Sequence, residues 1–183
     1  LHEACQDMDA GVNLSSMSER SCSIDPQAAL RVNGGGTLAL VSAAASAGVP
    51  RFVQLSTYKV YGNNPNGLVT EETLCRPQSH YAITHHVAED YVTSQHPNGI
   101  VFRLANGFGA PIDPTADCWA IIINEFCRQA IEGRRIIIRS SGQAWRNFVP
   151  MSNVVRALHA AITFAISDSS GRARSGGSVT AAV

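Results

Sequence analysis

The sequence predicts an α/β fold in which a parallel sheet is covered by helices on both faces. Two short segments, 51–56 and 99–104, are apolar almost throughout, which is typical of strands that are buried on both sides. They alternate along the chain with longer helical stretches, and this alternation indicates strand–helix–strand connections. Of the 183 residues, 45% are hydrophobic and only 15% are charged, so the chain can bury a sizeable core.

The first half of the chain predicts two strands with a long helix between them. We expect a short buried strand over 10–16, then a helix over 27–47 that Gly48 ends, and then the strand over 51–56. Three consecutive glycines, 34–36, are poor helix formers, but the apolar residues after them keep one helical face.

The second half continues the alternation. Ser79 caps a helix over 80–94, and an apolar strand follows over 99–104. The remaining predicted elements are a helix over 119–132, an isoleucine-rich strand over 135–139, an amphipathic helix over 152–164 and a mobile Gly/Ser/Arg-rich loop over 167–177.

Charge and cysteine content exclude several classes of protein. Fourteen basic residues balance fourteen acidic ones, so the chain lacks the basic footprint of a nucleic-acid binder. No apolar run reaches the roughly 18 residues of a membrane span, and the first residues do not resemble a signal peptide. Five cysteines without a C-x-x-C pair predict reduced thiols and a cytoplasmic protein. No initiator methionine is present, so we expect a fragment.

Polar residues follow the predicted strands at the sheet edge where ligands bind in such folds: Ser15 and Ser16, Thr57, and 106–109. Tyr81 opens the next helix, and His85 lies four residues later on the same face. A hydroxyl, a tyrosine and a basic neighbour form a proton-transfer set. A phenol needs its pKa of about 10 lowered by about 3 units to act as a base near neutral pH.

Five sequence motifs occur in order along the chain. They are Asn33-x-x-Gly-Thr37, the run from Gly48 to Gly62, Tyr81-Ala-Ile-Thr-His85, the run from Arg103 to Pro111, and Gly142-Gln-Ala-Trp-Arg-Asn-Phe-Val149. This series resembles the NAD-dependent epimerase/dehydratase family, the extended short-chain dehydrogenase/reductases. The resemblance implies a Rossmann-like domain that holds NAD or NADP, and a smaller lobe for a substrate that is often a nucleotide-sugar.

The resemblance also implies a role for each matching position. Tyr81 matches the tyrosine that moves a proton to or from a substrate hydroxyl, and Thr57 matches the Ser/Thr that hydrogen-bonds the same oxygen. Asn33 and His85 complete the expected catalytic set. Ser15, Ser16, Tyr81, His85 and Gly107 are the expected cofactor contacts, and Asn106 and Arg146 are the expected substrate contacts.

Three departures from the family pattern stand out. His85 occupies the position of a lysine that normally holds the nicotinamide ribose and lowers the tyrosine pKa. The glycine turn that binds the pyrophosphate is absent, so we expect a truncated Rossmann-like fold with part of a small substrate lobe. Asn147 replaces the usual aspartate. We expect residues 1–115 to form a partial NAD(P)-binding domain, and 116–183 to contribute to the substrate lobe and the last Rossmann elements.

Two functions remain open from the sequence. The first is an NAD(P)-dependent epimerase/dehydratase or reductase that acts on a nucleotide-sugar or related sugar, expected to be a homodimer. The alternative is a non-catalytic Rossmann-like binding or scaffold protein, or an inactive fragment. We expect no metal site, because the cluster of His80, His85 and His86 lacks metal-ligand spacing. Lys59 either replaces the missing lysine charge or is a solvated loop residue.

Overall fold

The computed structural model describes most of the chain and contains two compact units. The described residues are 1–62, 67–113, 115–116, 118–119, 121–143, 146–163 and the backbone of 179–182. The first unit comprises residues 1–104 and 158–183, and the second comprises 105–157. The division into residues 1–115 and 116–183 that the sequence suggests stays a prediction.

The first unit is built on a four-stranded sheet in which every pair of neighbouring strands is parallel. Its strands, in spatial order, are β1 (Gly11–Asn13), β2 (Phe52–Thr57), β3 (Gly99–Leu104) and β6 (Val179–Ala182). The predicted parallel sheet is therefore confirmed, whereas β6 was not anticipated. The predicted mobile loop over 167–177 lies outside the described residues.

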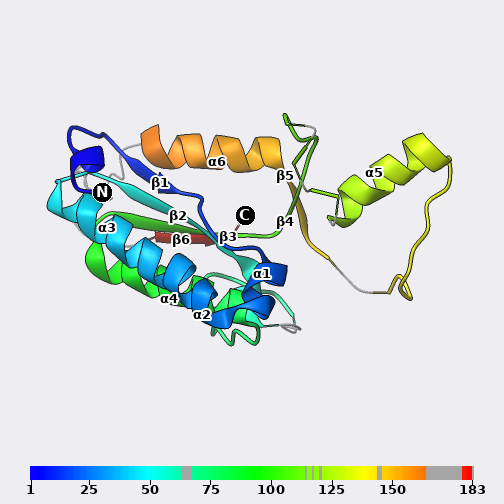
Figure 1. Ribbon diagram of the computed structural model, residues 1–183, viewed down its shortest axis with the longest axis horizontal. Coiled ribbons are helices and arrows are strands. Elements are labelled where there is room, and N and C mark those ends of the chain that lie inside the picture. Colours follow the sequence, from blue (N-terminus) through cyan, green and yellow to red (C-terminus); the bar gives the residue numbers. More distant parts are fainter. Residues whose placement is uncertain are drawn as a thin grey trace. The chain divides into compact units, whose positions relative to one another are not determined.

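Helices pack on both faces of this sheet (Figure 1). On one face lie α1 (Glu19–Ile24), α2 (Pro26–Ala29), a π-helical segment η2 (Leu30–Gly35), α3 (Gly36–Ser46) and α4 (His80–Gln95). On the other face lies the end of α6 (Met151–Thr163) from Leu158 onward, where the Arg51 guanidinium donates to the Ala161 carbonyl at 2.6 Å. Two 3-10 helices, η1 (Glu3–Cys5) and η3 (Tyr58–Tyr61), complete the unit.

The glycine-rich middle of the first long helical stretch is helical after all. α2, η2 and α3 follow one another without a break, so the predicted helix over 27–47 exists but contains a π-helical segment. A Cβ atom on Gly34 would lie 3.2 Å from Cγ1 of Val87 on α4. The missing side chain therefore allows these two helices to approach closely.

The hydrophobic core lies between β2, β3 and the helices α3 and α4. Its buried members are Cys5, Val41, Ala44, Val49, Phe52, Val92 and Val101. β2 is buried almost throughout, as expected for a central parallel strand. No described helix is long and apolar enough to cross a membrane.

The second unit, taken by itself, contains a small parallel sheet and one helix. β4 (Asn106–Phe108) pairs with β5 (Phe148–Pro150), and α5 spans Ile122–Gly133. The predicted strand over 135–139 is wrong. Ile136, Ile137 and Ile138 are each at least half exposed, and Ile137 N donates to the Gln129 side chain at 2.8 Å rather than to a strand. An apolar run forms a strand only where a partner strand meets it.

Candidate active site

Thr57 and Tyr81 meet at the carboxyl end of β2. Thr57 is the last residue of that strand; it is buried, and its hydroxyl accepts a hydrogen bond from Lys59 N at 3.3 Å. Tyr81 is the second residue of α4, whose first turn is capped by Ser79. The Thr57 side chain lies close enough to the Tyr81 hydroxyl to lower the pKa of the tyrosine. The structure thus brings together the two residues that the sequence proposed for proton transfer.

The surroundings of Tyr81 favour its protonated form. Burial raises the pKa of Tyr81 above its ordinary value, and the nearby Thr57 side chain lowers it without cancelling that effect. The charge of Glu19 on α1 raises the pKa further, and Cys22 and Tyr58 act in the same direction. At neutral pH the hydroxyl therefore holds its proton and can donate it.

His85 packs directly against Tyr81. The two ring centroids are 4.4 Å apart and the ring planes meet at 61°, an edge-to-face contact. The residue is 3% exposed, and neither ring nitrogen has a hydrogen-bond partner among the described residues. Burial lowers the pKa of His85 to about 4. The imidazole is therefore neutral at pH 7 and supplies no positive charge to Tyr81.

We expect the folded chain to lose stability as the pH falls from about 6.5 to about 4. Unfolded His85 binds a proton near its ordinary pKa, whereas the folded residue does so only near pH 4, so acid favours the unfolded state. This shift corresponds to about 3 kcal/mol. His96 acts in the same direction, because burial also lowers its pKa.

Urea unfolding followed across this pH range measures the effect. His85→Met removes both the titrating group and the two unpaired nitrogens while keeping an apolar side chain of similar size. This variant should lose the His85 part of the pH dependence and should be no less stable than wild type at pH 7. An unchanged pH dependence would contradict the burial of a neutral imidazole.

Asn33 links the loop after β1 to the tyrosine helix. Its carbonyl oxygen accepts from Met17 N at 2.8 Å, and its amide donates to the Thr84 hydroxyl at 2.9 Å. That hydroxyl in turn donates to the His80 carbonyl at 2.8 Å. Asn33 is 2% exposed and lies in the π-helical segment, a geometry that often marks functional sites. These contacts are those of a residue that orients α4; its predicted catalytic role stays a prediction.

Ser15 and Ser16 are exposed at the carboxyl edge of β1, next to the edge that carries Thr57. The Ser15 hydroxyl donates to the Asn13 side chain at 2.7 Å. Asn13 donates to Gln54 at 2.8 Å, so the loop is anchored to β2 through two buried amides. The two serines are accessible to a ligand, as a cofactor contact requires.

Lys59 is the only lysine of the chain. It lies on η3, two residues after Thr57, and its ammonium forms an ion pair with Glu19. The lysine side chain is 31% exposed and that of Glu19 is 50% exposed. The pair is therefore solvated, and Glu19 neutralises much of the charge that Lys59 could offer to the site.

The residues expected to contact the substrate lie in the second unit. Asn106 opens β4, and its side chain donates to the Asn147 carbonyl at 2.9 Å. Gly107 pairs with Val149 in the same small sheet, and Arg146 lies two residues before the start of β5. Within this unit the structure therefore places Asn106 and Gly107 on β4, beside β5 and the Asn147 carbonyl that Arg146 precedes.

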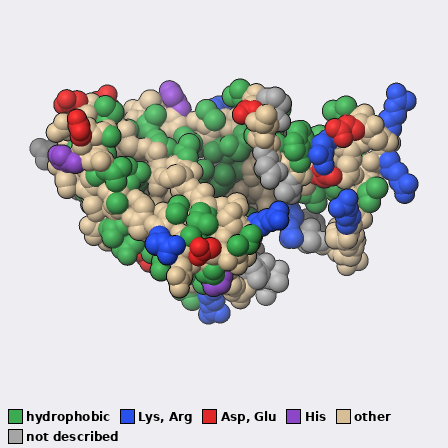
Figure 2. Space-filling view, in the orientation of Figure 1, with side chains coloured by type: hydrophobic (Ala, Val, Ile, Leu, Met, Phe, Trp, Pro, Cys, Tyr) green, Lys and Arg blue, Asp and Glu red, His purple; other side chains and the backbone are tan. Residues whose placement is uncertain are grey.

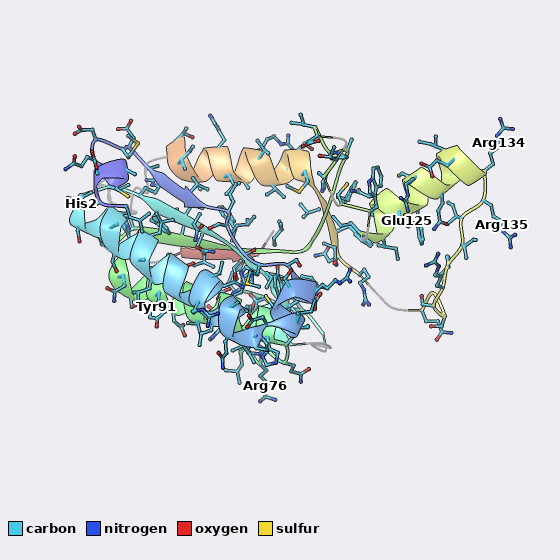
Figure 3. The ribbon with its side chains drawn as sticks, viewed as in Figure 1. His2, Arg76, Tyr91, Glu125, Arg134 and Arg135 are labelled. Atoms are coloured by element: carbon cyan, nitrogen blue, oxygen red, sulfur yellow. The ribbon has the colours of Figure 1, made fainter. Side chains whose placement is uncertain are left out.

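The second unit also has a cavity of about 600 Å³ between α5 and the segment after it. Its walls include Trp119, Phe126 and Ile138, together with polar side chains from α5. The Arg128 guanidinium lies 5.4 Å from the centre of the Trp119 ring and forms an ion pair with Glu125. Figure 3 labels Glu125 on this helix, and the solvent-directed Arg134 and Arg135 after it.

Sequence reasoning missed the buried ion pair between Glu89 on α4 and Arg103 on β3, which is 2.7 Å long. Glu89 also lies within 4.8 Å of Cys75 and His86 in a group of possible metal ligands. Both of its carboxylate oxygens already accept hydrogen bonds from Arg103, and one of them also from Ser56. A metal ion would have to displace a buried cation, so this group does not suit a metal.

Curated relatives of the chain include proteins named dTDP-glucose 4,6-dehydratase. The dTDP-glucose 4,6-dehydratase of Streptomyces griseus is 29% identical over 150 residues, which cover 76% of this chain and 42% of that protein. The human dTDP-D-glucose 4,6-dehydratase is 33% identical over 130 residues, which cover 69% of this chain and 36% of that protein. The chain thus spans less than half the length of these relatives.

Solved structures share the fold. MoeE5 in complex with UDP-glucose and NAD superposes with a TM-score of 0.81 at 24% identity, covering 100% of this chain and 58% of that one. The UDP-glucose 4-epimerase of Thermotoga maritima, solved with UDP-glucose, gives a TM-score of 0.74 at 25% identity and covers 85% and 52%, respectively. These superpositions confirm the Rossmann-like class of the fold.

A family model settles the membership that the motifs suggested. The model of the NAD dependent epimerase/dehydratase family matches residues 1–173, nearly the whole chain. The match includes the strand end with Thr57 and the helix with Tyr81. The chain belongs to the NAD-dependent epimerase/dehydratase family.

Proposed function

We propose that this chain is part of an NAD(P)-dependent enzyme that epimerises, dehydrates or reduces a nucleotide-sugar or related sugar. The observation that carries the proposal is the placement of Thr57 at the end of β2, on the carboxyl edge of the sheet, and of Tyr81 at the start of α4, where Thr57 lowers the pKa of the tyrosine. Ligands of open α/β sheets bind at this edge. The relatives that are named as dTDP-glucose dehydratases support the same substrate class.

Tyr81 would transfer a proton to or from a hydroxyl of the sugar. Thr57 would hydrogen-bond the same oxygen and fix the position of the phenol. NAD or NADP, when bound, would accept a hydride from the sugar carbon and return it. His85 packs on the Tyr81 ring and holds its orientation, but it contributes no charge.

Residues at the sheet edge fit such a cofactor. Ser15 and Ser16 offer exposed hydroxyls after β1, and the two unpaired nitrogens of His85 lie beside Tyr81. Unpaired buried polar atoms are rare in folded proteins and are commonly completed by a ligand or water. Gly107 in β4 is a further proposed cofactor contact.

Asn106 and Arg146 would bind the substrate, with the Arg146 guanidinium paired to its phosphates. Blue cationic side chains are prominent over the second unit in Figure 2. The described arginines of this unit include Arg128, Arg134, Arg135 and Arg139. The positive charge of these arginines would attract the negatively charged diphosphate of a nucleotide-sugar.

We further propose a cytoplasmic homodimer. Apolar side chains are exposed on the helical face of the first unit: Leu30 is 51%, Val32 47% and Ile83 42% exposed. They lie on η2 and α4. A second copy of the chain packed on these helices would remove them from water.

The alternative function is a non-catalytic binding or scaffold protein. The observation that favours it is the neutral, enclosed His85 at the position where the family has a lysine. Both functions predict binding of a nucleotide-sugar, and only the first predicts turnover.

Turnover by the protein in its natural full length separates the two. It would be incubated with NAD or NADP and with UDP- and dTDP-hexoses deuterated at C4. Movement of the label to a product carbon or to the cofactor supports the enzyme. Binding of the sugar nucleotide without any label transfer, for every sugar tested, supports the non-catalytic alternative.

We expect the 183-residue chain by itself to bind NAD or NADP only weakly. The pyrophosphate of a dinucleotide is normally held by a glycine-rich turn at a helix N-terminus, and no Gly-x-x-Gly-x-x-Gly segment occurs in this sequence. Titration calorimetry with both dinucleotides measures the affinity. Micromolar binding would show that the cofactor is held by other residues than those proposed.

A further inference from the structure

Glu89 ties the tyrosine helix to the two central strands of the sheet. One of its carboxylate oxygens accepts from the Ser56 hydroxyl on β2 at 2.5 Å. The other accepts from Nε and Nη2 of Arg103 on β3, at 3.0 and 2.7 Å. The side chains of Glu89 and Arg103 are only 4% and 9% exposed. In so buried a position each charge depends on the other.

The opposite edge of the Arg103 guanidinium holds the segment that follows β2. Nη1 donates to the Tyr61 hydroxyl at 2.9 Å and to the Glu71 carbonyl at 3.3 Å. The guanidinium carbon also lies 4.8 Å from the centre of the Tyr61 ring. Tyr61 ends η3, the short helix that Thr57 caps. Arg103 therefore contacts and stabilises both η3, through Tyr61, and α4, through Glu89.

These contacts lie immediately beside the proton-transfer pair. Ser56 precedes Thr57 in β2, and Glu89 follows Tyr81 by eight residues, on the same face of α4 as His85. We propose that Ser56, Glu89 and Arg103 are positioning residues that hold Thr57, at the end of β2, beside Tyr81, at the start of α4. The importance of Thr57 and Tyr81 for catalysis rests on the proposed function. The positions of these two residues in the fold do not depend on it.

A tyrosine titration can report this geometry without substrate or cofactor. The titratable groups that influence Tyr81 are Glu19 and Cys22 from α1, Tyr58 from η3 and His85 from α4. None of these is altered in the test. Because the Thr57 side chain lowers the pKa of Tyr81, any loosening of the pair should raise it.

The test follows tyrosine ionisation by ultraviolet absorbance in the 183-residue chain, with the Tyr81→Phe spectrum subtracted and circular dichroism recorded at each pH. Thr57→Val removes the hydroxyl that lowers the pKa of Tyr81, so this variant gives the reference value for complete loss of the Thr57 contribution. Ser56→Ala removes only the link from β2, and Glu89→Gln removes the charge. Val92→Ala, a buried core residue of α4 outside the network, is the control for general loss of stability.

We expect Ser56→Ala and Glu89→Gln to lower the acid dissociation constant of Tyr81 about threefold to tenfold, in the same direction as Thr57→Val. Val92→Ala should leave it at the wild-type value despite a lower melting temperature. If Glu89→Gln does not fold, the Tyr81 titration of Ser56→Ala is the deciding measurement, because this variant keeps the Glu89–Arg103 ion pair. The proposal is overturned if Ser56→Ala titrates like wild type, or if Val92→Ala shifts the titration equally. Failure of the proposed function would appear instead as absent turnover with an unaltered titration pattern.

Discussion

With the proposed function, replacing Tyr81 with phenylalanine should lower kcat of the full-length protein by about 10²- to 10⁴-fold, the usual contribution of a general acid–base group. The substitution removes only the hydroxyl. The edge-to-face contact with His85 and the helix cap at Ser79 remain, so the fold should be retained. Steady-state kinetics with one accepted nucleotide-sugar measures the change.

Tyr91→Phe is the matched control. Tyr91 lies on the same helix, α4, and packs beside the hydrophobic core rather than at the sheet edge (Figure 3). Loss of its hydroxyl should leave kcat within about twofold of wild type. Full activity of Tyr81→Phe would mean that another group carries the proton.

The second large effect concerns pH. With Tyr81 buried and His85 neutral, the phenolate fraction is small at pH 7, so the rate of a step that needs Tyr81 as a base should rise toward alkaline pH. His85→Lys places a fixed cation beside the phenol. A unit charge at about 4 Å contributes on the order of 4 kcal/mol at an effective dielectric of 20, and the burial that lowers the pKa of His85 also disfavours the ammonium and reduces this. The apparent pKa of the rate profile should therefore fall by about one unit.

His86→Lys provides the comparison for this experiment. His86 is adjacent in sequence but partly exposed, and it faces Asp90 at 3.7 Å rather than Tyr81. The pH–rate profile of this variant should coincide with that of wild type. A profile that does not move in His85→Lys, in a variant whose circular dichroism is unchanged, would show that position 85 does not tune the tyrosine.

Local sequence patterns predicted most of the sheet and of the candidate site. The strands at 52–57 and 99–104 are continuous apolar runs, and the helix at 80–95 begins at a recognisable Ser79 cap. Thr57 and Tyr81 could be found because each stands at the end of such an element. Their proximity follows from the topology, since a helix that crosses between parallel strands starts near the edge where the first strand ends.

The remaining features depend on contacts between distant residues. Glu89 reaches Ser56 and Arg103, which are 33 and 14 positions away, and no local spacing marks them as partners. The state of His85 depends on how completely Tyr81 and the neighbouring elements enclose it, and the residue type alone does not reveal that. The isoleucine run at 136–138 has the composition of a strand, but pairing decides whether a strand forms.

The solitary lysine has a practical consequence for chemistry on this protein. Apart from the α-amino group, the Lys59 ammonium is the only primary amine of the chain, and it is partly accessible, two residues from Thr57. Amine-selective reagents, which label most proteins at many places, would modify the 183-residue chain at a single side chain, next to the candidate active site. A fluorophore coupled there would sit where a nucleotide-sugar is expected to arrive, so its emission could follow ligand binding without any engineered cysteine.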